Sequence, residues 1–402
     1  MQAKPILRSL LAAAMLLSGC VTAPPTPTET AKSYGYFAEL MKAEADVDAA
    51  GDDASKRRFP LTMLATHQSF VGDTERAIET FRVSGTRPQR GSPADGIAEA
   101  DVRDALAAIV EAVRDRQIVM INEAHHVPRD RAFATLVAIE LRKVGFEYLA
   151  LETLDIRPEA TEALAARGYP LVEDGYYSRD PVFGDFIRRA LSVGYRPVAY
   201  EHSKFEESDP KRKHARREEG QARNIVERIL LKDPNARILV HVGYGHLRKA
   251  VEETNPIPTM MAEYLRLQTG IDPYTIDQTQ PLPADTARSQ SLIDAAPADA
   301  FVVTPRGAAR PYLASPAIDM FVFHKPVRLV DGRPYWLAMG GYRAPRKIPG
   351  KLLPRTGRRL VQALVANESA NAVPMDQVLV TAGEKPPVFM LPKGKYRFAF
   401  QE

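Results

Sequence analysis

The feature that most constrains the fold is a series of short apolar runs that alternate with helical patterns from residue 116 onward. The apolar runs are Ile118–Ile121, Tyr148–Leu151, Arg196–Tyr200 and Ile238–Val242, with a further candidate at Tyr274–Ile276. Helical patterns are expected at about 130–144, 181–193, 212–232 and 257–267. This alternation predicts an α/β fold built on a parallel sheet with helices on both faces, because parallel strands need crossover connections that cover the sheet.

The chain before and after this α/β core has different patterns. Residues 34–115 predict a helical N-terminal segment, with helices around 36–41, 74–81 and 98–114. Residues 286–402 predict a small β-rich domain with one helix around 355–367 and short apolar or aromatic runs at 300–303, 320–323, 335–339 and 396–400. The α/β core itself is expected to occupy residues 116–285.

The first residues resemble a bacterial secretion leader. Lys4 and Arg8 flank the start of an apolar run that is too short to span a hydrocarbon core of about 30 Å. The run ends at Leu17-Ser18-Gly19-Cys20, which is similar to the lipobox of bacterial lipoproteins, and Cys20 is the only cysteine. We therefore expect a lipoprotein signal peptide at 1–19, lipidation of Cys20 and a Pro/Thr-rich tether at 20–33. The resemblance implies a lipid-anchored protein of the cell envelope, and Val21 favours the outer membrane, facing the periplasm.

Composition excludes several other classes of protein. Hydrophobic residues make up 45% of the chain and charged residues 26%, as in ordinary globular proteins. The net charge of +4 leaves no excess of positive charge that would indicate nucleic-acid binding. The sequence contains no Gly-x-Ser-x-Gly, His-Glu-x-x-His or phosphate-cradling motif, so the commonest serine hydrolases, zinc proteases and nucleotide hydrolases are disfavoured.

Acidic and imidazole side chains follow each of the four main strand candidates. In chain order they are Glu123, His125 and His126, then Glu152, then Glu201 and His202, and last His246. A single such residue is commonly a helix cap or a solvated loop residue. Because the carboxyl ends of parallel strands meet at one edge, we expect all four groups to share a pocket. Such a cluster suits proton transfer near neutral pH or coordination of a divalent cation.

These motifs resemble, in order, those of a superfamily that includes erythromycin esterase-like, ChaN-like haem-binding and TIKI/TraB-type proteins. Asn122-Glu123-Ala124-His125-His126 is similar to its Gly-Glu-x-His or Gly-Glu-x-x-His motif, although Asn122 stands where Gly is usual. Gly243-Tyr244-Gly245-His246-Leu247 is similar to its terminal motif. The helix that carries Arg217, Glu218, Gln221 and Asn224 is similar to the Arg-rich helix of the esterase-like members. The resemblance spans about residues 105–280.

The resemblance implies two alternative functions. The first is a hydrolase of the esterase or metal-dependent peptidase type that acts on a small molecule or a peptide. The second is a haem- or iron-binding lipoprotein without catalytic activity, in which the histidines or Tyr176 and Tyr177 are axial ligands.

For the hydrolase we expect the following roles. The catalytic residues would be Glu123, His126 and His246, with His126 preferred to His125 because the esterase-type spacing selects it. Glu152, Glu201, His202 and His125 would balance charge or hold a divalent Mn, Fe, Co or Zn ion. Substrate would contact Tyr176, Tyr177, Arg179, Arg217 and Asn224. His241 lies inside an apolar strand and is interpreted as a core histidine.

Overall fold

The computed structural model describes residues 34–85, 100–202, 206–249, 259–282 and 287–402, which belong to one compact unit. The expected signal peptide, the tether and Cys20 lie outside the described residues, so the anchoring remains a prediction. Among the helices that the structure describes, none is both long enough and apolar enough to cross a membrane.

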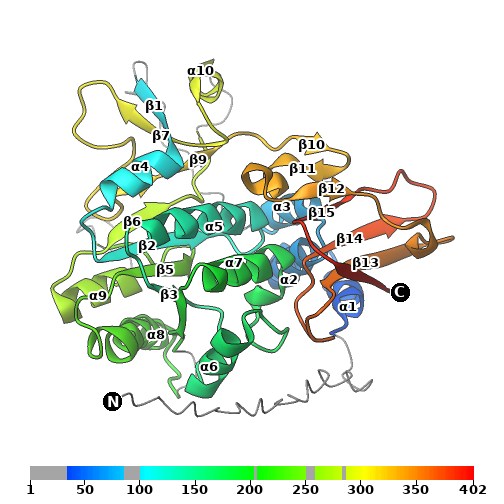
Figure 1. The fold of residues 1–402 in the computed structure, drawn as a ribbon, viewed down its shortest axis with the longest axis horizontal. Coiled ribbons are helices and arrows are strands. Elements are labelled where there is room, and N and C mark those ends of the chain that lie inside the picture. The colour runs from blue at the N-terminus through cyan, green and yellow to red at the C-terminus, as the bar shows by residue number, and fades with distance from the viewer. Residues whose placement is uncertain (1–33, 86–99, 203–205, 250–258, 283–286) are drawn as a thin grey trace, which may run out of the picture. The chain divides into compact units, whose positions relative to one another are not determined.

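The centre of the molecule is a six-stranded sheet in which every pair of neighbouring strands is parallel (Figure 1). Its order is β4 (Arg196–Ala199), β3 (Tyr148–Leu151), β5 (Ile238–Gly243), β2 (Ile118–Glu123), β6 (Tyr274–Asp277) and β8 (Met320–Phe321). The central strands β2 and β5 are buried at every position, as expected for parallel strands that are covered on both sides. The predicted parallel α/β sheet is therefore confirmed.

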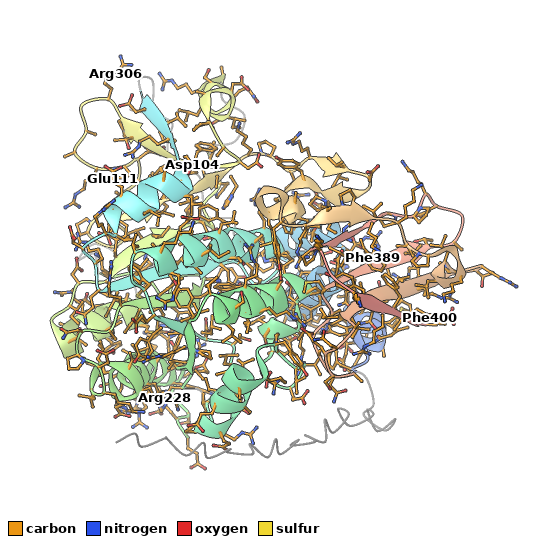
Figure 2. The ribbon with its side chains drawn as sticks, in the orientation of Figure 1. Asp104, Glu111, Arg228, Arg306, Phe389 and Phe400 are labelled. Atoms are coloured by element: carbon orange, nitrogen blue, oxygen red, sulfur yellow. The ribbon has the colours of Figure 1, made fainter. Side chains whose placement is uncertain are left out.

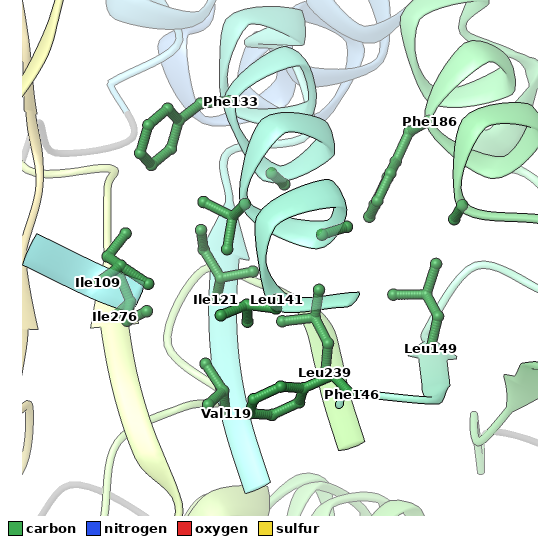
Figure 3. Packing of buried hydrophobic residues seen from close by; sticks show 14 of the residues in the cluster. Ile109, Val119, Ile121, Phe133, Leu141, Phe146, Leu149, Phe186, Leu239 and Ile276 are labelled. Atoms are coloured by element: carbon green, nitrogen blue, oxygen red, sulfur yellow. The ribbon is translucent and has the colours of Figure 1, made fainter. Parts of the chain in front are cut away.

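One face of the sheet packs against α5 (Pro128–Lys143), α7 (Pro181–Ser192) and α4 (Ala105–Ala112). Asp180 begins α7, because its carboxylate accepts hydrogen bonds from the backbone N–H groups of Val182 and Phe183. Figure 3 shows how side chains of the strands interdigitate with those of the helices, namely Val119, Ile121, Leu149, Leu239 and Ile276 with Phe133, Leu141 and Phe186.

The opposite face packs against α8 (Pro210–Ile225), which continues as a π-helical turn at Val226–Leu230, and against α9 (Met261–Thr269). Asp209 caps the first turn of α8 by accepting a hydrogen bond from the N–H of Arg212. Gly270 ends α9 in the left-handed conformation, with φ of 72°. Helices thus cover both faces, as predicted.

The N-terminal and C-terminal parts of the described chain pack on each other. Helices α1 (Tyr36–Ala49) and α2 (Ala54–Phe70) form a core with Leu360 of β13 (Arg358–Val365), and α3 (Thr74–Val83) packs on α2. Strand β13 lies between β14 (Asp376–Thr381) and β16 (Tyr396–Gln401) in an antiparallel sheet. Figure 2 shows Phe389 and Phe400 among these C-terminal strands.

The helix predicted around residues 355–367 is wrong, because this segment is the central strand β13. Leu360 packs towards α1 and α2, whereas Val361 and Ala363 pack into a separate core on the other face of the strand. This alternation has the period of two that a strand requires. Hydrogen bonds to two neighbouring strands outweigh the local helical pattern.

Two further segments differ from expectation. The stretch predicted as a helix from residue 98 contains a strand, β1 (Ala100–Asp104), before α4 begins, and β1 pairs with β7 (Ala300–Pro305). The run at 335–339 is part of a 3-10 helix, η3 (Tyr335–Gly341), rather than a strand. The remaining elements are α6 (Pro158–Arg167), η1 (Tyr177–Arg179), α10 (Ala287–Ala295), β9 (Phe323–His324), β10 (Leu329–Val330), β11 (Arg333–Pro334), β12 (Ala344–Arg346), η4 (Gly350–Leu352) and β15 (Phe389–Leu391).

A fully buried ion pair ties α7 to the C-terminal part of the chain. The Arg343 guanidinium donates from Nη2 and Nε to the same Asp185 oxygen, Oδ2, at 2.8 and 3.1 Å. Both side chains are shielded from solvent. The second Asp185 oxygen has no hydrogen-bond partner among the described residues, so its charge depends on Arg343.

Replacing Arg343 by Met should lower the free energy of unfolding by about 3–5 kcal/mol, because it leaves the Asp185 carboxylate buried and uncompensated. Urea unfolding followed by circular dichroism measures this change. The matched control is Lys347→Met at a nearby exposed position, which should change stability by no more than about 0.5 kcal/mol. Equal stability of the two variants would contradict the assigned role of the pair.

Candidate active site

The polar residues that follow strands β2, β3, β4 and β5 meet at one edge of the sheet. Glu123 of β2 pairs with Gly243 of β5, so these two strands end side by side. A cavity of about 610 Å³ opens there. It is lined by His125, Glu152, Thr153, Leu154, Asp155, Ile156, Glu173, Gly175, Tyr176, Tyr177, Glu201, Arg217, Tyr244 and His246. The structure thus brings Glu152, Glu201 and His246 together, with Glu123 directly behind His125.

Arg217 of α8 connects three of these groups. Its Nη2 donates to Glu152 Oε1 and to Glu201 Oε2, each at 2.6 Å, and its Nε donates to Glu201 Oε1 at 3.0 Å. Its Nη1 lies 3.2 Å from Nε2 of His246. Burial alone would raise the pKa of Glu152, but His246, His125 and Arg217 outweigh it and lower the pKa to about 2. Glu152 is therefore a carboxylate at neutral pH.

The face of α8 that carries Arg217 also fixes the turn after β4 through hydrogen bonds. Gln221 donates to Glu201 Oε1 at 3.1 Å, and Asn224 donates to the backbone oxygens of Tyr200 and Glu201, each at 3.0 Å. Positions 217, 221 and 224 share one side of a helix, which explains their common target. Asn224 thus positions Glu201 through the backbone and does not line the cavity.

His125 is held by a buried carboxylate and by a tyrosine. Its Nδ1 lies 2.8 Å from Oε1 of Glu123, and its ring stacks on Tyr177 with centroids 3.8 Å apart. Both oxygens of Glu123 also accept hydrogen bonds from Arg131, at 2.6 and 2.8 Å. Burial opposes ionisation of Glu123, but Arg131 and His125 outweigh it and hold its pKa well below the usual range. Glu123 therefore orients His125 and is itself buried.

His246 is oriented in a similar way, by a buried carboxylate of α8. Its Nδ1 lies 2.7 Å from Oε2 of Glu218, a fully buried carboxylate that also accepts from the N–H of Met261 at 2.9 Å. The Nε2 of His246 lies 3.6 Å from Oε1 of Glu152. Burial opposes protonation of His246, but the carboxylates of Glu152 and Glu218 outweigh burial and raise its pKa.

His126 does not line the cavity, which reverses our preference between the two neighbouring histidines. Its ring stacks on Phe81 of α3 with centroids 3.7 Å apart, and its Nδ1 is 3.4 Å from the hydroxyl of Tyr244. Burial, followed by the charges of His125 and Arg131, lowers its pKa to about 3. The turn after Glu123 decides the orientation, because Asp130 accepts from the N–H of Ala124 and Arg131 donates to the backbone oxygen of His125.

Two other residues that were expected in the site, Arg179 and His202, pack within the protein outside the cavity. Arg179 donates to the backbone oxygen of Val172 and lies over the ring of Tyr34, 4.6 Å from its centroid. The ring of His202 packs on Gly220 of α8, where an added Cβ would lie 2.1 Å from its Cδ2. Neither lines the cavity, whereas Tyr176 and Tyr177 do.

Sequence reasoning assigned no role to Arg131 and Glu218, which orient the two histidine systems. No sequence pattern marks Arg131, because the buried side of α5 also carries Asp130 and Thr135. His241 is a buried core histidine, as interpreted, between Phe183 and Phe186, and its Nε2 is 3.5 Å from Oε2 of Glu123. Burial lowers the pKa of His241 to about 4, so it is neutral at physiological pH.

A divalent metal does not fit the predicted ligand set. Glu123 and Glu201 both accept from an arginine through each of their two oxygens, and Glu152 accepts from Arg217 and from the N–H of Gly243. A cation would have to displace these guanidinium groups. Across the described ranges, no group of three or more His, Cys, Asp or Glu side chains is arranged to hold a metal ion.

Comparisons with known proteins found no matching family model and no matching curated protein. Similar solved structures include the type III effector HopBA1, with 13% identity over 58% of this chain and 99% of that one, at a TM-score of 0.32. RRSP, a MARTX toxin effector domain from Vibrio vulnificus, has 16% identity over 57% and 43%, at a TM-score of 0.30. The C-terminal region of Pasteurella multocida toxin has 9% identity over 72% and 48%, at a TM-score of 0.28. Similarity this slight transfers no activity to the present chain.

Replacing Gly243 by Ala should displace His125. A Cβ at this position would lie 2.5 Å from Cε1 and 2.7 Å from Nε2 of His125. A Cβ at Gly245 would meet only flexible side chains, with Cε of Met260 at 3.4 Å and Cδ of Arg248 at 3.8 Å. We expect Gly243→Ala to cost about 1–3 kcal/mol of stability and to shift the His125 imidazole NMR signals. The control, Gly245→Ala, should leave both nearly unchanged. Identical behaviour of the two variants would contradict the close approach.

Proposed function

We propose that this chain is a hydrolase of the cell envelope, anchored through a lipid on Cys20, that uses two carboxylate-oriented histidines to cleave an ester or amide bond. One observation carries the proposal. His125 and His246 line the same cavity, and each points its Nδ1 at a buried carboxylate, Glu123 or Glu218. An imidazole that donates from Nδ1 to a carboxylate is held in one orientation, which leaves Nε2 as the atom for proton transfer. In His246 this Nε2 lies between Nη1 of Arg217, at 3.2 Å, and Oε1 of Glu152, at 3.6 Å.

The two histidines would act as base and acid. His125 accepts a proton from a water molecule through Nε2 as the water oxygen attacks the carbonyl carbon of the substrate. His246, whose pKa the carboxylates around it raise, donates a proton to the leaving oxygen or nitrogen as the bond to that atom breaks. After product release His125 loses the proton that it accepted and His246 regains one, both by exchange with solvent, so the two histidines return to their starting states. No nucleophilic side chain and no covalent intermediate are required.

The other cavity residues would hold this pair in place. Arg217 fixes the Glu152 and Glu201 carboxylates and contacts Nε2 of His246, and Tyr177 fixes the plane of the His125 ring. Glu123 is a positioning residue in this scheme, and His126 has no role in it. Tyr176 and Tyr244 would contact the substrate from the cavity wall.

Substitution of the two histidines tests the assignment. His125→Ala and His246→Ala should each lower kcat by at least about 100-fold on any active member of a panel of p-nitrophenyl esters and chromogenic peptides, because each removes one proton-transfer group. His126→Ala, in the same turn, should keep most of the activity. Circular dichroism and urea unfolding establish that the variants are folded. Full activity of folded His125→Ala, or a complete loss of activity in folded His126→Ala, would contradict the roles assigned to these histidines.

The titration of His246 gives a second test, and its NMR measurement needs no substrate. Glu218→Gln removes a carboxylate that raises the pKa of His246, so this pKa should fall, as measured by NMR of protein labelled in its histidine side chains. Because a general acid works only while protonated, the alkaline limb of the kcat profile should move to lower pH by the same amount. Glu219→Gln, the exposed neighbour on α8, is the control and should change neither. An unchanged His246 pKa in Glu218→Gln would contradict the proposed pairing.

Haem capture is retained as a second proposal because one observation favours it. His125, His246, Tyr176 and Tyr177, the residue types that serve as axial haem ligands, line one cavity. Titration with haemin should then give a saturable Soret shift that His125→Ala and Tyr177→Phe weaken. A hydrolase without this role would give no such shift in the wild-type protein.

A further inference from the structure

A second cavity, of about 300 Å³, lies between the first turns of α5, strand β9 and the 3-10 helix η3. Its wall is mainly apolar, with Leu106, Phe133, Leu136, Trp336 and Met339. It shares no lining residue with the cavity that contains His125 and His246. Its volume is at the lower end of the range for ligand pockets, which suits one short chain or one ring.

Arg129 places an incompletely satisfied positive charge in this cavity. Its Nη1 donates to the backbone oxygen of Lys325 at 3.1 Å, whereas its Nε is sealed from solvent and has no hydrogen-bond partner among the described residues. Burial lowers the pKa of Arg129, as expected for a poorly solvated cation. Nε itself is out of a ligand's reach, but Arg129 lines the cavity, so its guanidinium is placed to pair with an anionic group bound there.

The other charged groups around the cavity leave it net positive. Asp104, labelled in Figure 2 at the start of α4, accepts from the N–H of Ala107 and is occupied as a helix cap. Asp299 is exposed at the rim. Lys325 donates from Nζ to the backbone oxygen of Ala296, and Arg328 lies over the ring of Tyr335. Among the lining residues three cations therefore face two anions, and Arg129 is also attracted by Asp130 and Glu75, which do not line the cavity.

The backbone of the apolar wall is strained. Met339 has φ of 46°, which a residue with a Cβ rarely adopts, and it is followed by Gly340 and Gly341 with φ of 67° and 90°. Such a conformation costs about 1–3 kcal/mol and persists where packing imposes it, frequently at ligand sites. Here it presents the buried Met339 side chain to the cavity.

We propose that this cavity is a binding site for a small amphipathic carboxylate. The apolar body of the ligand would pack on Phe133, Trp336 and Met339, and its carboxylate would accept hydrogen bonds from Arg129. This site is independent of the hydrolase proposal, because it contains neither of the two histidines assigned to catalysis.

Trp336 makes the site directly testable, because it is the only tryptophan in the chain and it lines the cavity. The full chain is titrated with octanoate, octylammonium and octanol, which share a chain length and differ in the charge of the head group. Octanoate should change Trp336 fluorescence saturably and bind at least about tenfold more tightly than the other two, because a hydrogen bond to a charged group contributes about 1.5–3 kcal/mol.

Variants separate the head group from the apolar body. Arg129→Met should weaken octanoate at least about tenfold and remove its advantage over octanol, and Arg129→Lys should keep a preference for octanoate over octylammonium. Ala338→Phe, which fills the cavity, should abolish the response to all three ligands. Arg310→Met, at an exposed arginine that does not line the cavity, is the control and should bind as the wild type does. Absence of saturable binding to the wild type, equal affinity for octylammonium, or unweakened octanoate binding by folded Arg129→Met would overturn the proposal.

Discussion

The arrangement of the site depends on how the protein neutralises the charge of carboxylates that the fold removes from water. Transferring an isolated carboxylate into the protein interior costs several kcal/mol, so each needs a cation with good geometry. Arg131 supplies it for Glu123, and Arg217 supplies it for Glu152 and Glu201. Arg131 belongs to α5 on one face of the sheet and Arg217 to α8 on the other. The two helical layers therefore converge on the same edge of the sheet through one arginine each.

This convergence gives two histidines related but different surroundings. His125 has one carboxylate at Nδ1 and a tyrosine ring on its face, whereas His246 has a carboxylate at Nδ1 and a second one near Nε2. Carboxylates on both sides favour the protonated form of an imidazole. The surroundings of the two histidines differ in the way that a base and an acid in one reaction would require.

The first turn of α5 links the proposed active site to the second cavity. Three consecutive residues point in three directions: Arg129 towards the second cavity, Asp130 towards the N–H of Ala124, and Arg131 towards Glu123. Gln278 adds a bridge, because it donates to the backbone oxygens of Asn122 and Asp130 and lies 3.2 Å from His324, which lines the second cavity. A single helical turn thus supports both cavities.

The local sequence determined the strands of the central sheet and the polar residues at their ends, because period and polarity are properties of neighbouring residues. It did not determine which of two adjacent histidines enters the cavity, since that depends on Asp130 and Arg131 reaching back to the turn. Nor did it determine that 358–365 is a strand, because a segment with a helical pattern extends when two partners supply its hydrogen bonds. Tertiary structure decided the conformation wherever contacts with residues distant in sequence outweigh the local preference. The orientation of both proposed catalytic histidines was decided in this way.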